Sequence, residues 1–118
     1  MFEENIETRE KIIRLAKKIE SDLIAGKFNQ IVSEYECDIT EADIREMLNK
    51  YSKPLFLTPD NEINNVKIIK IKTDEKNTWA VDWDLWTEKG RSDLTLLLDV
   101  TKETDGRFVA HILDIHVM

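Results

Sequence analysis

Three consecutive runs of β-type residues in the last third of the chain constrain the fold most. They cover residues 78–87 (TWAVDWDLWT), 92–101 (SDLTLLLDVT) and 108–118 (FVAHILDIHVM). Alternation of apolar and polar residues in such runs is typical of strands that bury one face. The joints at 88–91 and 103–107 are short and each contains a glycine, as hairpin loops often do. With a fourth run, VKIIKIK at 66–72, the pattern predicts an antiparallel meander over about residues 64–118.

Alternation in the first run separates an apolar face from an acidic one. Trp79 and Trp83 fall on the apolar face with Val81 and Leu85. The second run adds leucines to the same side, so we expect a packed core rather than a deep cavity. The opposite face of the first run carries Ala80, Asp82, Asp84 and Trp86.

The first half of the chain reads as helical. Apolar residues recur at intervals of three and four over residues 2–25, with Lys11, Arg14, Lys17, Lys18 and Glu20 expected on the solvent side. Gly26 is suited to end this helix in a left-handed conformation. Shorter helices are predicted at 28–35 and 41–50, the second with Thr40 and Asp43 as its cap, and residues 36–38 as a link.

Two prolines, Pro54 and Pro59, end the helical pattern before the strands begin. Helices over about residues 2–50 followed by a meander predict a single α+β domain over residues 1–118. In this layout the long helix lies across the concave side of a curved antiparallel sheet.

Composition narrows the class of function. The formal charge of −7, with ten acidic and five basic residues from Thr73 onward, argues against a nucleic-acid binder and favours a basic partner. The single cysteine, Cys37, excludes an intrachain disulfide and fits a reducing compartment, and neighbouring acids should raise its thiol pKa. Without a long apolar run or a signal-peptide pattern, we expect a cytoplasmic protein that does not insert into membranes.

The histidines and acids near the C-terminus are candidates for catalysis and metal binding. His111 and His116 lie five residues apart, which on a regular strand directs them to opposite faces and disfavours a shared metal. Asp114 and His116 share a face and could form an acid–imidazole pair in a pocket or a structural hydrogen bond. We expect no metal, no cofactor and no catalytic residues.

The outward-facing residues of the first two runs are the better candidates for contact with a partner. Asp82 and Asp84 share a face, where a pair of acids is either solvated or functional. Trp86 on the acidic face is either covered by a loop or a binding anchor. Arg91 and Asp93 flank a serine at a strand entry, where a hairpin-end ion pair and a partner contact are both open readings.

Several short phrases resemble known families. LIAGKFNQIVSEY at 23–35 resembles the opening of the nuclear transport factor 2-like (cystatin-like) superfamily of cone-shaped domains, and the closing DIHV run is similar to that superfamily's last strand. DLWT at 84–87, GRSDLTL at 90–96 and DIHVM at 114–118 resemble a small bacterial family of unknown function, some members of which lie beside polymorphic toxin genes.

The resemblance implies an immunity protein that neutralises a cognate contact-dependent inhibition toxin. The expected partner is a basic toxin domain whose active site the chain covers. On this hypothesis the interface residues are Asp82, Asp84, Trp86, Glu88, Arg91 and Asp93. The alternative is a small-molecule binder or an isomerase- or hydrolase-like enzyme that uses the cone pocket, with Asp114 or Asp82 as base. A homodimer through the sheet is compatible with either function.

Overall fold

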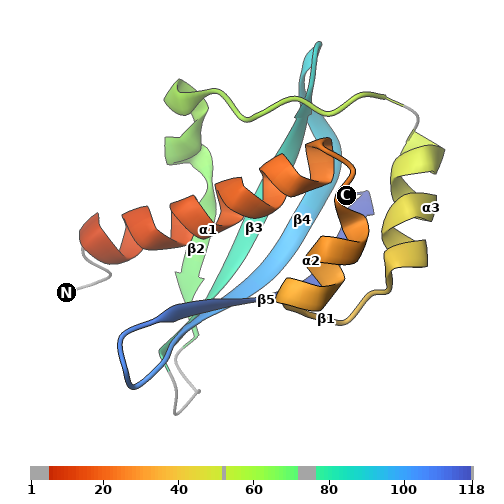
Figure 1. Ribbon diagram of the computed structural model, residues 1–118. Coiled ribbons are helices and arrows are strands. Elements are labelled where there is room, and N and C mark those ends of the chain that lie inside the picture. Colours follow the sequence, from red (N-terminus) through yellow and green to blue (C-terminus); the bar gives the residue numbers. More distant parts are fainter. Residues whose placement is uncertain (1–5, 52, 72–76, 118) are drawn as a thin grey trace.

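The computed structural model describes residues 6–51, 53–71 and 77–117. In these segments the helices come first and most of the sheet follows (Figure 1). The elements are α1 (Ile6–Ile24), α2 (Phe28–Glu34), β1 (Glu36–Cys37), α3 (Glu41–Tyr51), the 3-10 helix η1 (Asp60–Asn65), β2 (Lys67–Lys70), β3 (Asn77–Thr87), β4 (Gly90–Lys102) and β5 (Phe108–Val117). The predicted α+β class is confirmed. The start of the first helix, predicted to include residues 2–5, lies outside the described residues.

The sheet has the order β1-β5-β4-β3-β2. Strands β2 to β5 pair with their neighbours in antiparallel fashion, so the predicted meander is confirmed. The prediction of a simple link at 36–38 was wrong, because Glu36 and Cys37 form a short strand parallel to β5. The Asp38 amide also donates to the Ile112 carbonyl at 2.8 Å. This segment thereby satisfies backbone groups along the edge of β5 that would otherwise lack a partner strand.

The helix α1 lies across one face of the sheet, called the inner face below (Figure 1). Its apolar stripe and the inward side chains of the strands form one buried core. The alternation predicted for β3 is confirmed, since Trp79, Val81, Trp83 and Leu85 are buried while the residues between them are partly exposed. The buried core between α1 and the sheet includes Ile12, Ala16, Ile19, Leu23, Val81, Trp83, Leu85, Leu94, Leu96, Leu98, Val100, Ile112 and Ile115.

Local signals fix the ends of two helices as expected. Gly26 follows α1 with a φ of 75°, a left-handed conformation that costs glycine little. The Asp43 amide donates to Thr40 Oγ1 at 3.1 Å, and the Thr40 amide donates to Asp43 Oδ2 at 2.9 Å. These reciprocal bonds form the predicted cap of α3 and satisfy amides that have no partner within the helix.

The placement of Glu20 on the solvent side of α1 was wrong. Its side chain is 0% exposed and lies between α1 and the inner face. Glu20 Oε1 accepts from the Thr58 amide at 3.1 Å, and Oε2 accepts from the Thr58 hydroxyl at 2.7 Å and from Trp83 Nε1 at 3.0 Å. Burial of a carboxylate is tolerated only with such partners. Glu20 therefore ties the segment before η1 to both α1 and β3.

The assignment of the two histidines to opposite faces was also wrong. The pairing of β4 with β5 shifts between Leu97 and Leu98, which leaves one extra residue in β5. A bulge of this kind reverses the alternation of side chains beyond it. His111 and His116 therefore both lie on the face opposite α1, where their partners across β4 also face outward.

Candidate functional site

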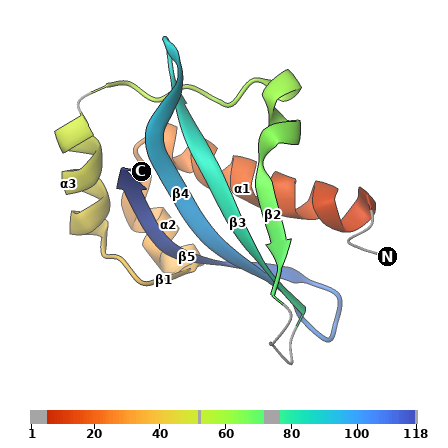
Figure 2. The same ribbon diagram turned by 180° about the vertical axis from the view of Figure 1, so that it is seen from behind.

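The face of the sheet opposite α1, called the outer face, has strands rather than helices toward the viewer in Figure 2. We define it by Asp82, Asp84 and Trp86 of β3 and by the residues beside them on β2, β4 and β5. The register places Lys67 of β2 opposite Asp82 and Thr95 of β4 opposite Asp84. All the residues predicted to contact a partner lie on this face or in the β3–β4 hairpin at its end.

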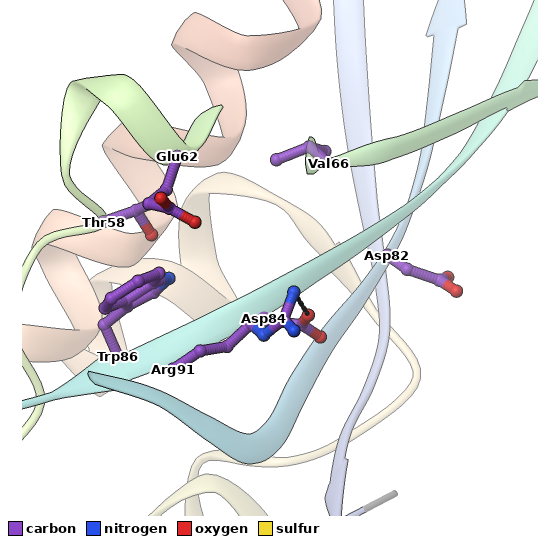
Figure 3. Close-up of a pocket in the computed structure, with 7 residues that line it drawn as sticks. All are labelled: Thr58, Glu62, Val66, Asp82, Asp84, Trp86 and Arg91. Atoms are coloured by element: carbon purple, nitrogen blue, oxygen red, sulfur yellow. Dashed lines mark ion pairs between the residues drawn. The ribbon is translucent and has the colours of Figure 1, made fainter. Parts of the chain in front are cut away.

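Asp84 is held by two neighbours on β4. Thr95 Oγ1 donates to Asp84 Oδ1 at 3.0 Å. Arg91 Nη1 lies 3.7 Å from Asp84 Oδ2 (Figure 3). The pairing of β3 with β4 shifts between Asp84 and Trp86, which brings Arg91 opposite Trp86. The hairpin-end ion pair of Arg91 therefore forms with Asp84 across the strands, and not with its near neighbour Asp93. Both side chains remain substantially exposed, so a partner can reach them.

Asp82 has a different environment although it lies only two residues away. No hydrogen bond or ion pair joins its carboxylate to the part of the chain that the structure describes. In Figure 3 it points away from the pair formed by Asp84 and Arg91. The side chain is half-buried, so Asp82 offers an unpaired carboxylate at a fixed position on a strand.

A hollow of about 360 Å³ lies on the outer face around these acids. Three carboxylates, Asp82, Asp84 and Asp93, face two basic groups, Lys67 and Arg91, so the formal balance at the hollow is negative. Glu88 is exposed in the hairpin turn beyond Trp86. The hollow is open, which suits contact with another surface better than enclosure of a substrate.

Trp86 is half-buried and sits beside the segment that precedes η1. The Phe56 amide donates to the Trp86 carbonyl at 2.8 Å, and the two residues form an isolated antiparallel bridge. A pocket of about 20 Å³ separates Trp86 from Thr58 and Glu62, which is room for about one water molecule (Figure 3). Trp86 is thus covered by a neighbouring segment, as one of the two predictions for it states. It is also partly accessible, as a binding anchor must be.

Two exposed apolar residues near Trp86, Phe56 and Leu57, were not predicted from the sequence as candidates for partner contact. Phe56 and Leu57 are 48% and 54% exposed, although large apolar side chains are usually buried. Their position is fixed on both sides, because Phe56 is bonded to Trp86 and Thr58 is bonded to Glu20. The signal in the sequence was the apolar run PLFL at 54–57 within a segment that lacks a helical or strand pattern.

Asp114 and His116 share the outer face, as predicted. His116 Nδ1 lies 3.7 Å from Asp114 Oδ2, and nearly half of each side chain is exposed. The other oxygen of Asp114 accepts from the Ile115 amide at 2.9 Å. The pair therefore belongs to the open side of the sheet, and not to a pocket between α1 and the inner face.

The inner face has little in common with the cone pocket that the alternative function requires. The space beside α1 is filled by buried apolar side chains, and both oxygens of the buried Glu20 already accept hydrogen bonds. Asp82 and Asp114, the candidate bases, lie on the other face of the sheet. Among the described residues, a packed core stands where that alternative requires a pocket.

Cys37 is half-buried at the edge of the sheet. Burial, and to a lesser extent the charge of Asp38, raises the pKa of its thiol. The predicted direction is confirmed, although burial is the larger cause. At neutral pH the thiolate fraction is therefore small, which makes Cys37 a poor nucleophile.

Within residues 6–51, 53–71 and 77–117, no group of three or more histidine, cysteine, aspartate or glutamate side chains is placed to hold a metal ion. Among the helices of the same segments, none is long and apolar enough to cross a bilayer.

Comparison with known proteins gives one result. Neither the curated proteins nor the solved structures contain a match to this chain. A family model described as "Domain of unknown function (DUF7668)" matches residues 17–118, which include every element from the second half of α1 to β5. The chain belongs to this family of domains of unknown function, DUF7668.

Proposed function

We propose that the protein is an inhibitory binding protein, an immunity protein that neutralises a cognate polymorphic toxin by covering its active site. The observation that carries the proposal is the outer face, where a carboxylate with no partner among the described residues, an open acidic hollow and a half-buried tryptophan lie together. The toxin partner comes from the resemblance of the 84–87, 90–96 and 114–118 phrases to a toxin-associated bacterial family.

The charge of the outer face suits a basic partner. Asp82, Asp84 and Asp93 line one hollow, and the whole chain has a formal charge of −7. Fields of this kind steer an oppositely charged protein toward the right surface and raise the association rate. In a nuclease-type toxin the carboxylates would occupy positions that substrate phosphates take.

The apolar residues beside the hollow suit a stable complex. Trp86, Phe56 and Leu57 offer aromatic and aliphatic area next to charged groups. Interfaces commonly concentrate binding energy in such aromatic anchors, surrounded by polar residues that exclude water. Because Glu20 and Trp86 hold this segment in place, little conformational freedom is lost when a partner binds.

The finer parts of the proposal follow from the resemblance. The layout of helices on a curved sheet is compatible with a cone-shaped domain of the nuclear transport factor 2-like type, and the protein would act in the cytoplasm of the toxin-producing cell. A second copy of the chain is another occupant that the outer face could accept, and the binding experiment below separates it from a toxin.

The test is a calorimetric titration against the C-terminal domain encoded immediately upstream of this gene. We expect nanomolar binding that weakens as salt is added. Asp82→Lys should weaken binding by about 10- to 100-fold, because it places a like charge against a basic surface. The matched control is Glu10→Lys, which makes the same charge change at an exposed position on α1.

Two results would overturn the proposal. One is the absence of binding by a folded protein, together with a dimer in sedimentation that Asp82→Lys dissociates, which would assign the outer face to a second copy. The other is an equal loss of affinity in Asp82→Lys and Glu10→Lys, which would mean that only net charge matters.

A further inference from the structure

A second surface feature lies on the α1 side of the sheet, away from the outer face. An open groove of about 500 Å³ runs between α1 and the β4–β5 hairpin. Figure 1 shows this hairpin below α1. The groove falls in the size range of small-molecule sites, and the function proposed above does not involve it.

The floor of the groove is apolar and well supported. It consists of Leu15 from α1, Tyr35 from the end of α2 and Phe108 from the start of β5. The Phe108 ring packs against Trp79, with the ring centroids 6.0 Å apart. Lys11 Nζ also lies 5.5 Å from the centroid of Phe108. Contacts from the core and from α1 therefore fix the floor.

The walls of the groove are basic in a chain that is acidic as a whole. Lys11, Arg14 and Lys18 follow one stripe of α1, and Arg107 faces them from the hairpin. Residues three and four apart on a helix share a side, which explains why the stripe lines a single groove.

Three of these cations already have acidic partners. Lys11 lies 3.4 Å from Glu7, Lys18 lies 2.7 Å from Asp22, and Arg107 lies 2.8 Å from Asp105. The pairs of Lys11 and Arg107 are exposed and screened by water, so an incoming anion can share or replace these partners at little cost. Lys18 stays with the buried Asp22 and contributes its charge to the wall.

Arg14 is the exception. No ion pair or hydrogen bond joins its guanidinium to the described residues, and the side chain is exposed. A guanidinium binds a carboxylate through two parallel hydrogen bonds. Tyr35 adds a neutral donor, since a phenol is protonated at neutral pH and burial raises its pKa further.

We propose that this groove binds a small amphipathic anion, an aromatic or aliphatic body that carries one carboxylate. The body lies on Leu15, Tyr35 and Phe108, and Arg14 holds the carboxylate with the help of the neighbouring lysines. The charge of the walls selects the anion, and the apolar floor selects its body. The site is independent of the partner that the outer face binds.

The test uses 1-naphthoate as the probe and neutral 1-naphthamide as its matched control, each titrated into the ¹⁵N-labelled protein. We expect naphthoate to shift the amide signals of Leu15, Tyr35 and Phe108, and naphthamide to bind about tenfold more weakly. Arg14→Gln should weaken naphthoate about tenfold and leave naphthamide unchanged. Arg45→Gln, an exposed arginine on α3, should change neither.

The proposal is overturned by equal affinity for the two probes, by an unchanged naphthoate affinity in Arg14→Gln, or by shifts confined to other parts of the chain. Binding of an oligoglutamate peptide at the groove without any binding of naphthoate would also contradict it, because the ligand would then be an acidic polypeptide. The amide spectrum of each variant reports whether it is folded.

Discussion

The two faces of the sheet each combine an acid with a tryptophan, yet the two combinations have opposite characters. On the inner face, Glu20 and Trp83 are fully buried and bonded to each other, and Glu20 also accepts two hydrogen bonds from Thr58. On the outer face, Asp84 and Trp86 are partly exposed, and Asp82 lacks a partner among the described residues. The difference teaches that burial and completed hydrogen bonding, rather than residue type, separate a structural acid from one available to a partner.

The largest expected effect is on the inner face. Trp83→Ala removes a fully buried ring and leaves the Glu20 carboxylate without its indole donor. We expect a loss of about 3–5 kcal/mol in the free energy of unfolding, measured by urea denaturation. Trp86→Ala should lose far less stability, because Trp86 is only half-buried. An equal loss in the two variants would show that the two tryptophans do not differ in their structural role.

Glu20 gives the next largest effect. Glu20→Leu orphans three donors and should cost about 3 kcal/mol in the free energy of unfolding. Glu20→Gln keeps one carbonyl acceptor and should cost less, while exchange of the Thr58 amide with solvent should accelerate in both variants. If Glu20→Leu were as stable as the parent, the buried carboxylate would have no structural role.

Asp82 should have almost no effect on stability. Asp82→Asn removes a charge that has no partner in the described structure, and we expect a change within about 0.5 kcal/mol in the same unfolding measurement. A marked destabilisation would show that Asp82 is a structural residue. A marked stabilisation would instead indicate that the acids on the outer face repel one another, which sharpens the case that they are kept for binding.

The reactivity of the Cys37 thiol measures how well neighbouring residues cover this edge of the sheet. Because burial raises the pKa of the thiol above its ordinary value of 9.0, less thiolate is present at pH 8 than in an exposed cysteine. Alkylation by iodoacetamide should therefore be slower than for a cysteine-containing peptide at pH 8 and should accelerate as the pH rises above 9. A rate equal to that of the peptide would show that the edge is open.

The sequence was sufficient to predict the meander and the faces of β3, because strand alternation is a local property. It could not reveal the burial of Glu20, whose partners Thr58 and Trp83 lie 38 and 63 residues away. The prediction for His111 and His116 assumed a regular strand, and counting the residues between them could not reveal the bulge in β5 that places both on one face. The partner of Arg91 likewise depended on an irregular register between β3 and β4.

The central claim is that the outer face is the surface that contacts a partner, and the tryptophan indole signals test it most directly. The chain contains three tryptophans, and the structure places Trp86 on the outer face and both Trp79 and Trp83 in the core. Addition of the proposed partner, the domain encoded immediately upstream, to the ¹⁵N-labelled protein should shift the Trp86 indole signal and leave the signals of Trp79 and Trp83 in place. Binding that leaves the Trp86 signal unmoved would contradict the account.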